Sequence, residues 1–143
     1  MQMTIIESIR NYICNLDCMK TFEGVINANF LAGEVDSFSI EEVPCNPILK
    51  KYLDGSTKRQ FQFSFCSREP YGAEIIQNID NSGFYEEFTE EIEKNNDAGI
   101  LPTNEDIESL NIKVTSSAYI VTTEEDTAMY QINLNFIYYK GVN

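Results

Sequence analysis

Hydrophobic residues at helical spacing open the chain and predict an amino-terminal helix. They recur every three or four positions: Ile5, Ile6, Ile9, Tyr12, Ile13 and Leu16. Thr4 precedes them at an N-cap position, and Glu7 lies three residues later, which is the spacing of a capping box. We therefore expect a helix from about Thr4 to Asn15 or Cys18, with one apolar face turned toward a core.

Alternating and β-branched stretches predict four strands in the first half of the chain. The expected strands cover residues 25–31, 38–43, 48–53 and 58–67. The last two form the best hairpin candidate, because Asp54-Gly55 between them is a strong turn signal. In the fourth strand, polar residues alternate with Phe61, Phe63 and Phe65. This period of two indicates one buried face and one solvent-facing face.

The second half of the chain predicts two helices followed by a long hairpin. The helices are expected over residues 73–79 and from Phe84 to about Lys94, because Asn81-Ser82-Gly83 favours a break between them. A loop over 95–105 and a short helical turn over 106–110 should follow. The hairpin arms are expected at 111–122 and 128–139. In the second arm the polar face carries Gln131, Asn133 and Asn135.

Strands on both sides of a helical segment are typical of an α+β fold. The expected order is α-β-β-β-β-α-α-β-β, with the helices packed on one face of a mostly antiparallel sheet. The length of 143 residues, without a linker or repeat, predicts a single domain over residues 1–143. Apolar runs stop at four residues and the start lacks a secretory-signal pattern, so we expect neither a membrane span nor export.

Charge is abundant and unevenly distributed. The chain has 10 basic and 23 acidic residues, a formal net charge of −13, of which residues 69–143 carry −12. Proteins that clamp nucleic acid need many lysines and arginines, so a general DNA or RNA binder is excluded. The acidic half is either a solvated surface that aids solubility or a surface that repels phosphate or meets a basic partner.

The residue types available argue against an enzyme. The chain has no histidine, so Ser-His-Asp and Cys-His catalytic arrangements are impossible within it. The cysteines lack metal-site spacing and are expected to be reduced, small apolar residues: Cys14, Cys18, Cys45 and Cys66. We expect no catalytic residue, metal or cofactor. An enzyme would need a carboxylate pair, such as Glu69 with Glu74, at catalytic distance.

Two charged clusters in predicted hairpins are the candidate interaction sites. The basic cluster flanks the Asp54-Gly55 turn and consists of Lys50, Lys51, Lys58 and Arg59. The acidic tip of the last hairpin consists of Glu124, Glu125 and Asp126. The basic cluster lacks aromatic residues suited to base stacking, so contact with the acidic half of a second copy is favoured. Such head-to-tail contacts close into rings when the rotation permits. A merely solvated tip, and a solvated helix face for the glutamates of 86–93, are the simpler alternatives.

Seven stretches taken in order carry a family resemblance: TIIESIR (4–10), FSIEEVPCNPI (38–48), KYLDGS (51–56), RQFQF (59–63), SREPYG (67–72), QNIDNSGFY (77–85) and EEDTAMYQI (124–132). Together they resemble small proteins from prophages and tailed phages of Gram-positive bacteria, whose members are labelled minor capsid or phage structural proteins. Within that family the chain is most similar to the tail-terminator group, whose genes lie between those for the head and the tail tube.

The resemblance implies a virion structural protein that acts as a hexameric ring. Such a ring caps the tail tube and joins it to the head, with the tail-tube protein and the head-connector protein as partners. DNA passes through its lumen without being specifically bound. The expected location is the bacterial host cytoplasm during assembly and then the virion. The alternative is an acidic, non-enzymatic module of a prophage that binds or regulates a basic host protein as a monomer.

Overall fold

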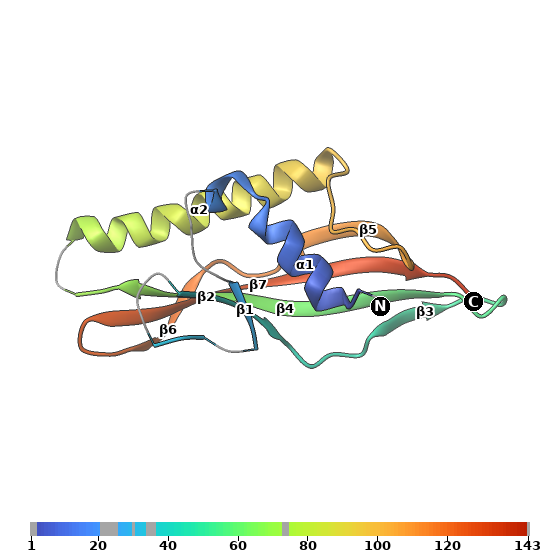
Figure 1. Ribbon diagram of the computed structural model, residues 1–143, viewed down its shortest axis with the longest axis horizontal. Helices are drawn as coiled ribbons and strands as arrows, with labels where there is room; N and C mark the ends of the chain where they lie inside the picture. The colour runs from blue at the N-terminus through green and yellow to red at the C-terminus, as the bar shows by residue number, and fades with distance from the viewer. Residues whose placement is uncertain (1–2, 21–25, 30, 34–36, 73–74, 143) are drawn as a thin grey trace.

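A mixed, mostly antiparallel sheet with helices on one face forms an α+β fold (Figure 1). The computed structural model describes residues 3–20, 26–29, 31–33, 37–72 and 75–142. Over these residues the helical elements are α1 (Ile5–Cys14), the 3₁₀ turn η1 (Asp17–Met19) and α2 (Ile75–Asp97). The strands are β1 (Ile26–Ala28), β2 (Ser37–Glu42), β3 (Ile48–Lys51), β4 (Thr57–Pro70), β5 (Ile107–Val114), β6 (Tyr119–Thr123) and β7 (Thr127–Lys140).

Strands β4 and β7 form a long antiparallel ribbon at the centre of the sheet. Each has 14 residues, and they pair along their whole length, from Thr57 opposite Lys140 to Pro70 opposite Thr127. Strands β2 and β3 lie one after the other along the free edge of β4. Strands β5 and β6 do the same along β7, and β1 adds to β2 in parallel. Short strands therefore flank most of the ribbon on both edges, with gaps at residues 60–62 and 69–70 of β4 and at residues 132–133 of β7.

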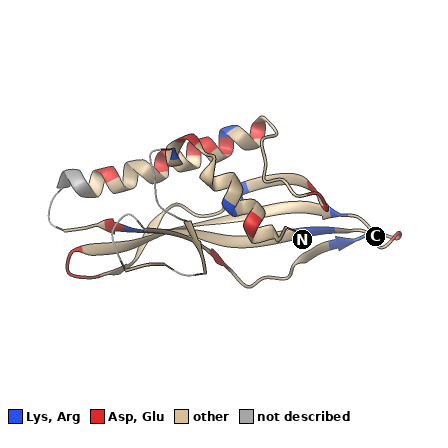
Figure 2. Ribbon diagram, viewed as in Figure 1, with Lys and Arg blue, Asp and Glu red and all other residues tan. Residues whose placement is uncertain are grey.

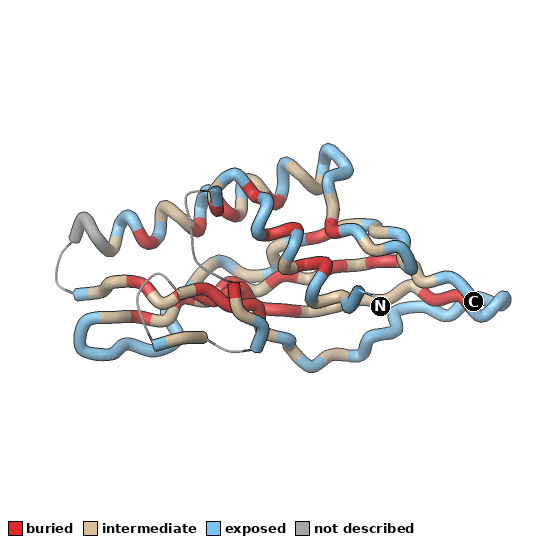
Figure 3. Tube along the Cα trace, viewed as in Figure 1, coloured by how far each residue is buried: buried red, intermediate tan, exposed pale blue. Residues whose placement is uncertain are grey.

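The core lies between the ribbon and the helices, and it uses the predicted alternation. Phe63 and Phe65 of β4 are fully buried, as are the apolar residues of α1 and α2 that face the sheet: Ile9, Ile13, Phe88 and Ile92. The Phe65 ring stacks between Phe38 at 5.4 Å and Phe88 at 4.9 Å between ring centroids. Buried positions gather in the middle of the sheet and along α1 and α2, whereas the turns are exposed (Figure 3). The predicted alternation of one core face with one solvent-facing face is confirmed along β7, but not in the middle of β4, where every residue from Phe63 to Ser67 is buried.

The amino-terminal helix begins as predicted. The Thr4 side chain accepts a hydrogen bond from the Glu7 backbone N–H at 3.2 Å, which satisfies one of the free donors of the first turn. The helix ends at Cys14, and η1 follows it directly. Of the strand expected over 25–31, the structure shows β1 at Ile26–Ala28. Val25 and Phe30 lie outside the described residues.

The prediction of two helices around Asn81-Ser82-Gly83 is wrong, because α2 runs through these residues without a break. Asn81 is only 8% exposed, and its side-chain amide donates to the Pro70 carbonyl at 2.7 Å and to the Tyr130 hydroxyl at 3.4 Å. Its polar group is therefore used to attach the helix to the sheet and does not compete for a local turn. Residues 73–74, where the first helix was expected to begin, lie outside the described residues.

The carboxyl-terminal region has three strands where two were expected. The helical turn predicted over 106–110 is wrong, since Ile107 already pairs with Lys140 as the first residue of β5. The single strand expected over 111–122 is divided at residues 115–118 into β5 and β6. The order over the described residues is therefore α-β-β-β-β-α-β-β-β. Pairing with the full length of β7 supplies hydrogen bonds that the local sequence does not reveal.

The continuous helix leads to a prediction at Gly83. Gly83→Ala should raise the free energy of unfolding by up to about 1 kcal/mol, because alanine loses less conformational entropy in a helix interior. A Cβ atom there would have no heavy atom within 4 Å. Urea unfolding measures the change. The matched control is Gly99→Ala, which should destabilise the protein because Gly99 has φ +76°. A destabilising Gly83→Ala would contradict a helix that passes through this position.

Candidate functional site

The structure brings the four cations of the basic cluster together at one end of the molecule. Lys50 of β3 lies directly opposite Lys58 of β4, and Arg59 is opposite Ile48. The Lys50 ammonium lies 5.3 Å from the Tyr52 ring centroid, and Arg59 Nε donates to the Thr57 hydroxyl at 2.9 Å. Figure 2 shows this concentration of positive charge near the carboxyl terminus. Like charges on opposite strand positions repel, so a carboxylate brought here from outside would be stabilising.

The turn that joins β3 and β4 is built from its own residues. The Asp54 carboxylate accepts hydrogen bonds from the Ser56 N–H at 2.9 Å and from the Ser56 hydroxyl at 2.5 Å. These hydrogen bonds lower the pKa of Asp54. Gly55 has φ +92°, which favours glycine at this position. The one carboxylate of the hairpin is thus occupied by its own turn, and it leaves the cations available.

The acidic tip lies at the opposite end of the ribbon from the basic cluster (Figures 1 and 2). Its three residues connect β6 to β7 and are exposed. The turn is held by the backbone: Glu124 N–H donates to the Thr127 carbonyl at 2.7 Å, and Tyr71 N–H donates to the Asp126 carbonyl at 2.9 Å. At ~3.3 Å per residue along β4, the two clusters are roughly 40 Å apart. They cannot contact each other within one chain.

The sheet face that the helices leave uncovered carries a network of uncharged polar side chains. Ser64 donates to Asn133 at 2.8 Å, Gln131 donates to the Tyr119 hydroxyl at 2.9 Å, and Asn135 donates to Gln60 at 3.2 Å. The predicted polar face of the last strand is confirmed. Cys66 lies on the same face, where burial and the nearby Glu41 carboxylate raise the pKa of its thiol to about 12. This thiol therefore stays protonated near neutral pH.

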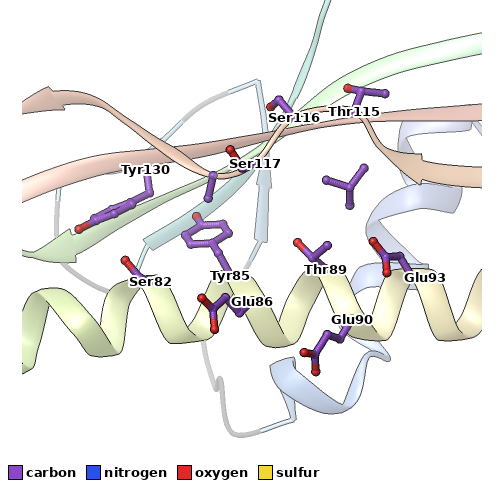
Figure 4. Close-up of a pocket in the computed structure, with 12 residues that line it drawn as sticks. Ser82, Tyr85, Glu86, Thr89, Glu90, Glu93, Thr115, Ser116, Ser117 and Tyr130 are labelled. Atoms are coloured by element: carbon purple, nitrogen blue, oxygen red, sulfur yellow. The ribbon is translucent and has the colours of Figure 1, made fainter.

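A groove of about 690 Å³ separates α2 from the break between β5 and β6. We call it the α2 groove, and its lining is Ser82, Tyr85, Glu86, Thr89, Glu90, Glu93, Val114, Thr115, Ser116, Ser117, Ala118 and Tyr130. Tyr85, Thr89 and Glu93 project from the helix toward the segment with Ser116 and Ser117 (Figure 4). No pattern in the sequence predicted this groove. Its one local signal was the spacing of Glu86, Glu90 and Glu93, which places three carboxylates along one side of a helix.

Glu91, on another side of α2, has a structural role. Its carboxylate accepts hydrogen bonds from the backbone N–H groups of Asp17 at 2.5 Å and Cys18 at 3.0 Å. It thereby caps η1 and attaches the segment after α1 to α2. The expectation of a wholly solvated glutamate face does not hold for this residue. Glu90 lies between the two regions, because it lines the α2 groove and also a smaller hollow next to Glu91.

Few charged side chains pair with one another in the part of the chain that the structure describes. There the ion pair within 4 Å is Lys20 with Asp17, which are three residues apart on the surface. The same residues include no group of three or more Cys, Asp or Glu side chains placed to hold a metal ion. Glu69 is buried, and Glu74, its suggested partner in a carboxylate pair, lies outside the described residues. No helix among the described residues is long and apolar enough to span a membrane.

Neither a protein-family model nor a curated protein sequence matches the chain.

Proposed function

We propose that the protein is a virion assembly component of a tailed phage or prophage. Its specific role in this proposal is that of a tail terminator, a ring that caps the tail tube and joins it to the head connector. The protein is then made in the bacterial cytoplasm and remains in the virion. The proposal assigns it no catalytic residue and no cofactor.

The observation that carries the proposal is the separation of charge along the molecule. The basic cluster lies at one end of the β4–β7 ribbon, where its cations have no carboxylate within 4 Å among the described residues. The acidic tip lies at the other end, and the carboxylates of the α2 groove lie between. The basic cluster and the acidic tip can therefore meet only between copies. Contacts between two different surfaces of one chain build rings or filaments.

The overall charge is compatible with DNA passing through such a ring. A formal net charge of −13 repels phosphate, and the 10 basic residues are too few to hold a nucleic acid by its backbone. A channel that binds DNA weakly leaves it free to move. The resemblance to the tail-terminator group supports the same role.

The mass of the protein in solution tests the proposal. Light scattering should be recorded over a concentration range, first for the chain alone and then after mixing with the tail-tube protein of the same phage. We expect a species close to six times 16.4 kDa in at least one of the two samples. Lys50→Glu with Lys51→Glu should abolish it, whereas Lys113→Glu, at an exposed position of β5, should not.

A monomer at every concentration, with and without the tube protein, would refute the ring. The acidic module would then be the better explanation, because residues 69–143 carry most of the negative charge. That second function predicts a tight one-to-one complex with a basic protein and no larger assembly.

A further inference from the structure

We propose that the β3–β4 hairpin of one copy docks into the α2 groove of a second copy. The inference rests on the proposed function, because a ring requires an interface between copies. It assigns that interface to specific residues and places the receptor for the basic cluster at the α2 groove of the acidic half, not at the acidic tip.

The hairpin presents apolar and cationic side chains together. Leu53 at its turn is fully exposed, and Leu49 and Tyr52 beside it are 45% and 36% exposed. Residues 48–59 hold four cations and the single carboxylate of Asp54, a net charge of +3. Large apolar side chains at the end of a projecting hairpin are costly to leave in water and are typical of a protein contact. Figure 1 shows the hairpin extending beyond the helices at this end of the molecule.

The α2 groove has the complementary composition. Its lining includes three glutamates and no cation, a net charge of −3. The half-buried Val114 and Ala118 supply apolar surface between them, above the buried rings of Tyr85 and Tyr130. Carboxylates four residues apart on a helix repel each other, so a cationic occupant would stabilise this side of α2. The volume of about 690 Å³ lies within the range of sites that enclose a ligand of several side chains.

The hairpin and the groove of one chain cannot combine. Tyr130 of the groove lies opposite Ser67 of β4, ten residues from Thr57 at the base of the hairpin. At ~3.3 Å per residue, the paired strand holds them roughly 33 Å apart. The hairpin must therefore reach a second copy, whose own hairpin is left for a third. This contact is head-to-tail, as the proposed ring requires.

The acidic tip is a weaker receptor than the α2 groove. Its carboxylates lie on an exposed turn, and exposed ion pairs contribute little because water screens them. The groove offers carboxylates together with concave apolar surface, where Leu53 and Tyr52 would lose contact with water. Burial of apolar surface supplies more affinity than exposed charge pairs do.

Disulfide trapping between two variants, each with one introduced cysteine, tests the proposal. In a background with Cys14, Cys18 and Cys45 replaced by alanine and the buried Cys66 retained, Leu53→Cys marks the hairpin and Thr89→Cys marks the groove. The matched control is Glu125→Cys at the acidic tip. After mild oxidation of mixed variants, we expect the Leu53–Thr89 cross-link to form about tenfold faster than the Leu53–Glu125 cross-link, because docking aligns the reacting thiols. Ser117→Cys, on the opposite wall, is the second groove position if the Thr89 variant does not fold.

Charge reversal gives the decisive comparison. Lys50→Glu, Lys51→Glu and Lys58→Glu on the hairpin partner should reduce the cross-link to the control rate. Glu86→Lys, Glu90→Lys and Glu93→Lys on the groove partner should restore it.

A cross-link that forms equally fast at the acidic tip, or whose rate is unchanged by both sets of substitutions, would overturn the inference. A ring that forms while cross-linking only at the tip would refute this interface and keep the proposed function. A hairpin–groove cross-link without a closed ring would support this interface and refute the proposed ring.

Discussion

Replacing Phe65 by alanine is expected to lower the free energy of unfolding by about 3–5 kcal/mol. The Phe65 side chain is fully buried at the middle of β4, and its ring is stacked between those of Phe38 and Phe88. Alanine would remove contacts to β2 and to α2 at the same time and leave a cavity between helix and sheet. Single domains are commonly stable by about 5–15 kcal/mol, so this one change would remove a large share.

Urea unfolding followed by circular dichroism measures the effect of Phe65→Ala. The matched control is Gln62→Ala, which alters the same strand on the uncovered face and should cost less than about 1 kcal/mol. Gln62 makes one long side-chain hydrogen bond, to Gln60 at 3.5 Å. Equal effects at the two positions would contradict the assignment of the core to the helix side of the sheet.

Replacing Tyr85 by phenylalanine is expected to cost about 1–3 kcal/mol, although it removes a single oxygen. The Tyr85 hydroxyl and the Ser67 hydroxyl lie 2.5 Å apart and are both buried, so each satisfies the other. The Tyr85 side chain is only 3% exposed, and this burial raises the pKa of its hydroxyl well above the ordinary value. Without it, the Ser67 hydroxyl would keep its desolvation cost and lose its partner.

A double-mutant cycle isolates this hydrogen bond. Ser67→Ala in the Tyr85→Phe background should recover part of the lost stability, because two apolar partners leave no buried polar group unsatisfied. Tyr119→Phe is the control, since its exposed hydroxyl can exchange a protein partner for water. Strictly additive losses for Tyr85 and Ser67 would mean that the two hydroxyls do not interact.

The parts of the fold that were predicted from sequence are those that neighbouring residues determine. Thr4 caps α1 through a residue three positions away, and Asp54-Gly55 forms its turn with Ser56. The prediction of a helix break at residues 81–83 was wrong because the Asn81 side chain donates hydrogen bonds to Pro70 and Tyr130, which are remote in the sequence. Likewise, β5 begins at Ile107 only because β7 is there to pair with it.

Among the candidate surfaces too, those formed by neighbouring residues were predicted and those formed by remote residues were not. The basic cluster was predicted because a tight hairpin brings Lys50 and Lys58 together. Its distance from the acidic tip depends on the register of β4 with β7, which no local pattern specifies. The α2 groove needs both the unbroken helix and the gap between β5 and β6. Neither was predicted, so three carboxylates on one side of a helix were interpreted as solvated.

The full-length pairing of β4 with β7 has a mechanical consequence. A pull on the β3–β4 hairpin acts along the axis of β4, whereas the hydrogen bonds to β7 run perpendicular to it. The load is therefore shared in shear by a ladder of 14 residue pairs, and no pair can be opened before its neighbours. Copies joined through their hairpins would resist tension along the direction in which the sheet is strongest.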